Sequence, residues 1–282
     1  MSRVDRVRSG IFRRGSRTYF NSTRFFPAAV RRDVHALYAF VRTADDFVDS
    51  TPQDAPGFEA FRRRYLDRRE GRPGPAGPII DGFVELSERR GFEPAWVDAF
   101  LDSMAQDLSR REYGTLDETL AYVYGSAEVI GLMMARIMGL EENASRPARL
   151  LGRAMQYINF IRDIREDLDL GRTYLPRDEI LAAGLASLRE DEARRSPEAF
   201  RAFVRGQVRR YRDWREEAAP GFALIPRRLR IPIRTAADMY EWTAGRIEAD
   251  PFVVHGRKVR PSAGRIVSRG IRNLITGGDG DR

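Results

Sequence analysis

The chain has 282 residues, no cysteine and only two histidines, His35 and His255. This composition excludes disulfides, thiolate metal sites and cysteine nucleophiles, and it argues against a histidine-rich metal centre or a histidine-based catalytic triad. Hydrophobic residues make up 42% of the chain and charged residues 32%, as in an ordinary folded protein. Any catalytic chemistry must therefore use carboxylates, hydroxyls, tyrosines and arginines. Carboxylates favour hard ions such as Mg²⁺.

The net charge of +8 comes almost entirely from arginine, since Lys258 is the only lysine. Such an excess indicates either a compositional bias or attraction to polyanions: nucleic acid, an anionic membrane surface or phosphorylated substrates. The arginine-rich N-terminus has no apolar core of signal-peptide length, and the most apolar stretch, 121–139, is interrupted by Glu128 and Arg136. We expect a cytoplasmic protein in which 121–139 is a buried helix, and we leave a peripheral membrane contact open.

Helical spacing dominates the chain from the first third onward. Alternating runs typical of strands are scarce, and Pro- and Gly-rich segments at 50–57 and 70–78 indicate loops. The sequence predicts a single all-α domain over residues 1–282, with a core at about 11–265 and a tail at 266–282. Apolar stripes with helical period occur around residues 34–41, 95–108, 118–138, 148–168, 199–215 and 233–248.

The first acidic cluster is Asp45-Asp46-Phe47-Val48-Asp49. Positions 34, 37, 38, 41, 45 and 48 form one helical stripe, so Asp45 continues an apolar face and Asp49 lies one turn further. Carboxylates on a core-facing stripe are costly unless a positive group neutralises them. A bound cation is one such partner, and Arg42, one turn earlier, is the other.

The second acidic cluster follows an apolar stripe that turns polar part-way along one face. Asn159, Asp163 and Asp167 are spaced by four, so on a helix their oxygens can point to a common position. A charged surface helix explains Arg165 and Asp169, but it does not explain polar residues on the inner stripe. Facing helices of a bundle build metal sites in this way. The two clusters predict opposite walls of one site.

Such a site would use Mg²⁺ held by a few carboxylates and by phosphate oxygens of a substrate. Arg42 and Arg162 each lie beside an acidic cluster and would bind the diphosphate as charged forks. The chemistry expected of this arrangement is metal-assisted departure of diphosphate, which leaves a carbocation.

Four parts of the chain, 16–49, 104–139, 156–176 and Tyr240 with Arg257 and Lys258, resemble the squalene/phytoene synthase family of head-to-head prenyl transferases. The segment QYINFIRDIREDLDLGRTYLP at 156–176 is the most specific part, and the resemblance runs from about residue 11 to about residue 265. It implies an all-α isoprenoid synthase fold. It also implies the coupling of two allylic prenyl diphosphates through a cyclopropyl diphosphate, with Mg²⁺ as cofactor and Mn²⁺ as an alternative.

The resemblance also implies roles for individual residues. Aromatic faces stabilise a passing cation, and a dry apolar cavity keeps water from quenching it. The implied metal ligands are Asp45, Asp49, Asn159, Asp163 and Asp167. The implied diphosphate contacts are Ser16, Arg42, Arg162, Tyr174 and Arg257. The tyrosines implied to line the pocket near the reacting carbons are Tyr38, Tyr124 and Tyr240.

Glu128 departs from the family pattern, in which a small residue usually occupies this position. A carboxylate there would lie at the cavity wall, pair with an arginine such as Arg136, or point away from the site. The shape and polarity of the prenyl channel depend on which of these holds.

The segments at 25–27, 37–42 and 159–167 resemble those of microbial phytoene synthases. This favours the coupling of two geranylgeranyl diphosphates (C20) to phytoene through prephytoene diphosphate, a step of carotenoid biosynthesis. The alternative is coupling of farnesyl diphosphate (C15) to squalene, dehydrosqualene or presqualene diphosphate. There is no glycine-rich dinucleotide fingerprint, and we expect no use of NADPH.

Outside enzymes, the main rival is a basic nucleic-acid-binding helical protein; a catalytically inactive helical partner protein is another, and the intact pair of acidic motifs argues against it. The nucleic-acid-binding alternative predicts basic residues along one exposed helix and gives no reason for inward-facing acids. We therefore expect prenyl diphosphates as partners and no nucleic acid, with the open membrane contact serving product release.

Overall fold

The computed structural model describes residues 22–256 and 258–276. Over these ranges the chain is helical and forms no strand; one isolated parallel bridge joins Glu112 and Thr173. The predicted all-α class is thereby confirmed. Ser16 and Arg257, both predicted to contact diphosphate, lie outside the described residues.

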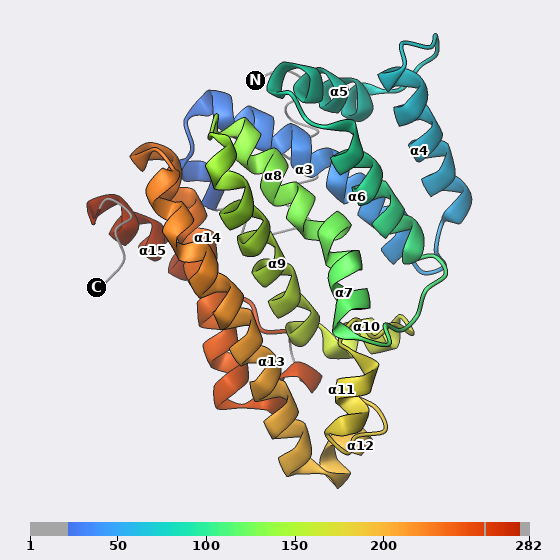
Figure 1. The fold of residues 1–282 in the computed structure, drawn as a ribbon, viewed down its shortest axis with the longest axis vertical. Coiled ribbons are helices and arrows are strands. Elements are labelled where there is room, and N and C mark those ends of the chain that lie inside the picture. Colours follow the sequence, from blue (N-terminus) through green and yellow to red (C-terminus); the bar gives the residue numbers. More distant parts are fainter. Residues whose placement is uncertain (1–21, 257, 277–282) are drawn as a thin grey trace.

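The α-helices are joined by short loops and by single turns of other helix types (Figure 1). Their bounds are α3 Ala28–Asp49, α4 Ala55–Arg69, α5 Pro78–Arg90, α6 Pro94–Gln106, α7 Leu116–Val123, α8 Val129–Ile137, α9 Ser145–Arg162, α10 Ile164–Asp169, α11 Arg177–Ala182, α12 Glu190–Arg195, α13 Pro197–Ala218, α14 Arg227–Ala249 and α15 Ala263–Ile275. The short turns are η1 Thr23–Phe25, η2 Tyr124–Glu128, η3 Glu142–Ala144, η4 Ala219–Leu224 and η5 Pro251–His255, of which η2 is a π-helix.

Local sequence signals account for several helix ends. The Asp54 side chain accepts a hydrogen bond of 2.9 Å from the Gly57 amide at the start of α4, and Ser262 caps α15 in the same way. Helix α5 ends at Gly91, whose φ of 62° suits a residue without a Cβ. The loops predicted from Pro and Gly therefore lie where the helices stop.

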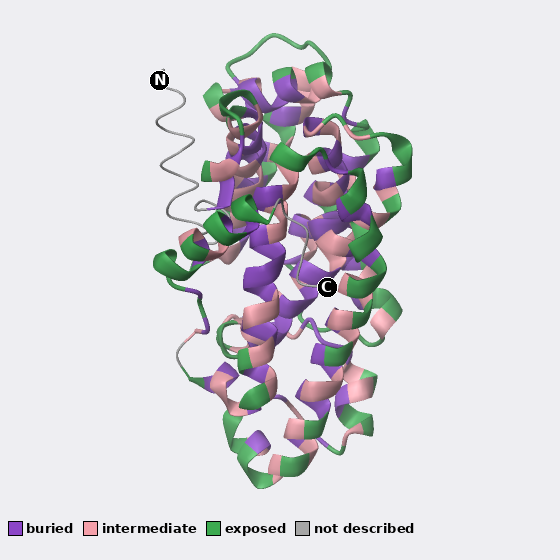
Figure 2. Ribbon diagram, turned by 90° about the vertical axis from the view of Figure 1, so that its left-hand side faces the viewer, coloured by how far each residue is buried: buried purple, intermediate pink, exposed green. Residues whose placement is uncertain are grey.

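The longer helices α9, α13 and α14 run side by side, with α3 and α8 next to them and α4, α5 and α6 covering α3 on one side (Figure 1). Buried apolar side chains form one continuous cluster from Phe26 to Val254. The exposed residues concentrate on the outer faces and in the loops (Figure 2). The two acidic clusters lie at the C-terminal end of α3 and across the junction of α9 and α10.

The apolar stretch 121–139 is confirmed as a core helix, formed by the end of α7, the η2 turn and α8. Val123 and Val129 are fully buried. In the part of the chain that the structure describes, Leu116–Ile137 is the one helical stretch long and apolar enough to cross a membrane, but 56% of its most apolar window is buried inside the protein.

Helix α15 corrects the predicted tail at 266–282. Residues up to Ile275 are helical, because Ile266, Gly270 and Asn273 form a buried face against α14. The Asn273 amide donates hydrogen bonds of 3.1 Å to Thr235 Oγ1 and 2.9 Å to Asp238 Oδ2. The buried face of this helix includes the polar residue Asn273 and a glycine, so its sequence does not form a continuous apolar stripe.

Candidate active site

The first acidic cluster lies at the C-terminal end of α3. Arg42 donates to Asp45 Oδ2 at 2.6 Å and also contacts Asp46 Oδ1 at 2.6 Å. Asp49, one turn further, accepts a hydrogen bond of 2.8 Å from Arg172 Nη1. The protein itself therefore supplies a positive partner to each acid, including the Arg42 partner considered from the sequence.

The second cluster crosses a break between two helices. Helix α9 ends at Arg162, and Asp163 has φ −100° and ψ 13° before α10 begins. The helical hydrogen bonds nevertheless continue across the break, from the Asp163 amide to the Asn159 carbonyl and from the Asp167 amide to the Asp163 carbonyl, both at 2.8 Å. The i, i+4 spacing therefore still places the side chains of Asn159, Asp163 and Asp167 on one side of the helical segment.

Asp163 has two cationic partners. The Arg162 guanidinium forms a fork to it, with Nε to Oδ1 at 2.7 Å and Nη2 to Oδ2 at 2.5 Å. Lys258 Nζ lies 3.0 Å from Asp163 Oδ1 and also contacts Glu166. Burial acts to raise the pKa of Asp163, but these partners outweigh it and hold the pKa below its usual value.

The structure brings the two clusters together. Burial, and then the charges of Asp163 and Asp49, raise the pKa of Asp167 well above its usual value. Burial and then the charge of Asp49 raise the pKa of Asp45 to about 7. Burial is the larger cause of both rises, and the neighbouring carboxylates add to it, so the ionised forms of Asp45 and Asp167 lie close to other negative charges. This acidic region, formed by Asp45, Asp49, Asp163 and Asp167, favours a cation.

A buried network beneath Asp49 was missed by the sequence analysis. Arg172, 3% exposed, donates to Asp49, to the Val48 carbonyl at 2.5 Å and to the Tyr174 hydroxyl at 3.2 Å. Asp107, at the end of α6, accepts from the Tyr174 hydroxyl at 2.8 Å and from the Tyr122 hydroxyl at 2.7 Å. The hydroxyl of Tyr174, a residue predicted to contact diphosphate, thus accepts a hydrogen bond from Arg172 and links it to Asp107.

Sequence signals for this network existed but were weak. Arg172 lies inside the segment 156–176, between Gly171 and Tyr174, and Asp107 directly follows the apolar stripe of α6. Burial raises the pKa of Asp107 to about 6, although the charge of Arg172 opposes this. Lys258, the only lysine in an arginine-rich chain, belongs to the C-terminal part of the family resemblance, and its contact with Asp163 is a finding of the structure.

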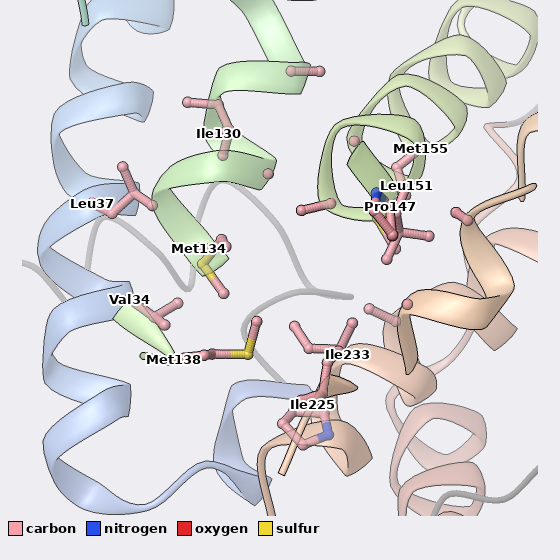
Figure 3. Close-up of a pocket in the computed structure, with 18 of the residues that line it drawn as sticks. Val34, Leu37, Ile130, Met134, Met138, Pro147, Leu151, Met155, Ile225 and Ile233 are labelled. Carbon is pink, nitrogen blue, oxygen red and sulfur yellow. The ribbon is translucent and has the colours of Figure 1, made fainter. Parts of the chain in front are cut away.

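An apolar cavity of about 270 Å³ lies between α3, α8, α9 and α14 (Figure 3). Side chains from all four helices point into it, among them Leu37, Met134, Leu151 and Ile233 (Figure 3). Its polar lining includes Gln156 and Asn159 of α9, Ser22 and Thr23 of the η1 end, Ser126 and Tyr38. Because Asn159 belongs to the second cluster, the cavity reaches the acidic region.

The three tyrosines predicted to line the pocket differ in position. Tyr38 lines the cavity, whereas Tyr124 and Tyr240 are not among the described lining residues. Burial raises the pKa of Tyr38, with Arg42 opposing the rise and Asp45 adding to it. Tyr124 opens the η2 turn, whose Ser126 and Ala127 do line the cavity.

Glu128 closes the η2 turn and points away from the cavity. It is 1% exposed and accepts from Arg149 Nε at 2.9 Å and Arg153 Nε at 2.6 Å, both on α9. The suggestion that Arg136 is its partner is wrong: Arg136 lies 3.9 Å from Glu93 and 3.7 Å from Glu142. Glu128 therefore leaves the channel apolar.

Comparison with known proteins decides the family. The family profile described as squalene/phytoene synthase matches residues 12–265. The chain belongs to the squalene/phytoene synthase family. It is 33% identical over 238 residues to the 15-cis-phytoene synthase of Enterobacter agglomerans, covering 80% of each chain. It is 31% identical over 245 residues to that of Pantoea ananas, covering 83% of this chain and 79% of the relative.

Solved structures agree on the fold. A crystal structure of a dehydrosqualene synthase in complex with ligand superposes with a TM-score of 0.83 at 22% identity, covering 97% of this chain and 96% of the other. A squalene synthase from Alicyclobacillus acidocaldarius gives a TM-score of 0.78 at 22% identity, covering 88% and 94%. The fold is that of the isoprenoid synthases, and the chain is a transferase of a family that condenses prenyl diphosphates head to head.

The family uses a divalent metal, and the residues of this squalene/phytoene synthase homologue fit one. Asn159 Oδ1 is buried and has no hydrogen-bond partner among the described residues. An amide oxygen left in this way is costly, and it is a ligand type that Mg²⁺ accepts. No group of three acidic or imidazole side chains in the described ranges forms a ready-made metal shell. Substrate phosphate oxygens and water would complete the coordination, as is usual for Mg²⁺.

Proposed function

We propose that this enzyme condenses two geranylgeranyl diphosphates to phytoene, through prephytoene diphosphate, in carotenoid biosynthesis. The observation that carries prenyl diphosphate chemistry is an apolar cavity that meets two facing acidic clusters at Asn159. The choice of the C20 substrate draws support from the 15-cis-phytoene synthases that are 31–33% identical to this chain over most of its length.

In this proposal the acidic region binds the metal and the diphosphate, and the apolar cavity holds the prenyl chains. Asp45, Asp49, Asn159, Asp163 and Asp167 would hold Mg²⁺, or Mn²⁺ in its place. The metal, when bound, offsets the charge of the diphosphate and favours its departure.

The arginines beside these acids bind the same group. Arg42 and Arg162 present guanidinium forks next to Asp45 and Asp163, and a fork of this shape matches two diphosphate oxygens. Arg172 holds Asp49 in place from the buried side. Ser16 and Arg257 remain predicted diphosphate contacts.

The apolar end protects the carbocation. Leu37, Met134 and Leu151 line a wall that offers no water close to the allylic carbons. Burial raises the pKa of Tyr38, so its hydroxyl stays protonated over the physiological pH range and its ring face stays available to a cation. Tyr240, buried on α14, would act with Tyr38 on the same cation.

A product analysis tests the proposal. The purified protein is incubated with Mg²⁺ and either C15 or C20 diphosphate, with and without NADPH, and the hydrocarbons are identified by chromatography and mass spectrometry. Phytoene from the C20 substrate without NADPH is the expected result. Conversion of the C15 substrate alone, to dehydrosqualene, presqualene diphosphate or NADPH-dependent squalene, would replace the proposal by C15 coupling.

A further inference from the structure

Lys258 is the only lysine in a chain with 49 lysine and arginine residues, and it lies at the acidic region. It follows the η5 turn, which packs against α10. Two hydrogen bonds hold the last residue of that turn, His255: Arg165 Nη1 donates to its carbonyl at 3.0 Å, and its ring Nε2 lies 2.9 Å from the Leu188 carbonyl. The backbone three positions before Lys258 is therefore held beside α10.

The Lys258 ammonium bridges two carboxylates of the second cluster. Its Nζ lies 3.0 Å from Asp163 Oδ1 and also contacts Glu166 Oε2. The side chains of Lys258 and Asp163 are only 18% and 14% exposed, so solvent screens their attraction weakly. The charge of Lys258 also opposes the rise in the pKa of Asp167 that burial and the neighbouring carboxylates cause. One ammonium thus offsets the charge of two of the predicted metal ligands.

A lysine at this position can move more easily than an arginine. Arg162 already holds both oxygens of Asp163 with a guanidinium fork, at 2.7 and 2.5 Å. An ammonium is a compact point charge on a flexible four-carbon stem, so it can leave one oxygen and reach another without breaking a fixed two-bond geometry. Of the two cations on Asp163, Lys258 is therefore the one that leaves at the smaller cost.

The ammonium and a divalent metal need the same oxygen. Asp163 Oδ1 accepts from Arg162 Nε and also lies beside Lys258 Nζ, so both of its lone pairs have a cationic partner. A doubly charged ion brought to this carboxylate would also be repelled by the adjacent ammonium. Metal binding therefore requires Lys258 to leave Asp163, which is costly unless another anion receives the ammonium.

We propose that Lys258 competes with the divalent metal for Asp163, and that the substrate diphosphate ends the competition by taking the ammonium. This competition rests on the proposed function, which assigns Asp163 to the metal. The diphosphate oxygens accept the Lys258 ammonium, and the carboxylate oxygen that it leaves becomes open to the metal. Each ligand alone binds weakly, and each strengthens the other by the same factor. The metal site is thereby completed only when a diphosphate is present.

Mn²⁺ binding to the full chain tests the competition without turnover. Free Mn²⁺ is measured by electron paramagnetic resonance while the wild type and Lys258→Met are titrated, first without and then with inorganic diphosphate. A protein-free titration gives the Mn²⁺ that diphosphate binds in solution. Lys258→Gln repeats the test with a polar, uncharged side chain. Arg72→Met is the matched control, because Arg72 also bridges two acids, Asp67 at 2.7 Å and Glu70, but follows α4.

Without diphosphate, both Lys258 variants should bind Mn²⁺ about tenfold more tightly than the wild type, because the competing charge is gone. Diphosphate should raise the Mn²⁺ affinity of these variants by a smaller factor than that of the wild type, and Arg72→Met should match the wild type in both titrations. Equal or weaker Mn²⁺ binding by both Lys258 variants, or an equal gain in Arg72→Met, would overturn the proposal. If none of the proteins binds Mn²⁺ even with diphosphate, the metal assignment of the proposed function is itself wrong, and the competition is excluded with it.

Discussion

Replacing Glu128 with alanine removes the buried acid that holds two arginines of α9. Each hydrogen bond from a charged donor contributes about 1.5–3 kcal/mol, which sets the upper limit for the loss. Two effects reduce it: the side chains of Arg149 and Arg153 are 44% and 22% exposed and can regain water, and the variant no longer buries a carboxylate. We expect the free energy of unfolding to fall by about 2–4 kcal/mol.

The loss is measured by urea denaturation of the full chain at neutral pH, followed by circular dichroism. Glu128→Gln keeps the volume and should lose roughly half as much, because an amide oxygen still accepts one hydrogen bond. Arg136→Ala is the control, since its acidic neighbours lie at 3.7–3.9 Å on the surface and should contribute less than about 1 kcal/mol. A Glu128→Ala protein as stable as the wild type would refute the reasoning.

Three further outcomes are expected. Asp163→Asn should lower the rate of diphosphate release by more than about a hundredfold with an unchanged circular dichroism spectrum. Asp169, whose side chain is 71% exposed, is the control, and Asp169→Asn should keep the wild-type rate. A wild-type rate from Asp163→Asn would exclude the metal assignment. Because the folded pKa of Asp107 is raised from 3.8 to about 6, the stability that its protonation provides is fully present below pH 3.8 and is lost as pH rises through 6. From about pH 3 to about pH 7 the unfolding free energy of the wild type should fall by about 3 kcal/mol relative to Asp107→Asn, and parallel curves from urea titrations would contradict this. Ile130→Trp, which narrows the cavity, should reduce kcat/KM for a C20 substrate about tenfold more than for a C15 substrate, and an equal loss for both would show that this wall does not select chain length.

The parts of the site that depend on neighbouring turns of one helix could be predicted from the sequence. Asp45 follows the apolar stripe of α3, and Asn159, Asp163 and Asp167 keep a spacing of four across the break between α9 and α10. Helical period is a local property, so the phase of a side chain can be read from its position in the chain. The same property predicted the buried helix at 121–139.

Contacts between distant segments could not be predicted in this way. Arg172 reaches Asp49 across 123 positions, and Lys258 reaches Asp163 from the other side of the site. An arginine such as Arg136 was one partner expected for Glu128 from the sequence, but packing of α9 against the η2 turn places Arg149 and Arg153 beside it. Which arginine meets which acid depends on how the helices cross.

The sequence by itself determined the all-α class, the two inward-facing acidic clusters and, through its resemblance, the squalene/phytoene synthase family. These follow from helical phase and from motifs that lie within single segments. Only the tertiary structure decided that Tyr174 supports Arg172, that Glu128 leaves the cavity apolar, and that α15 packs through Ile266 and Asn273 while Ile271 and Leu274 stay exposed. The physical reason is that burial and charge pairing depend on the whole packed molecule, whereas periodicity depends on one helix at a time.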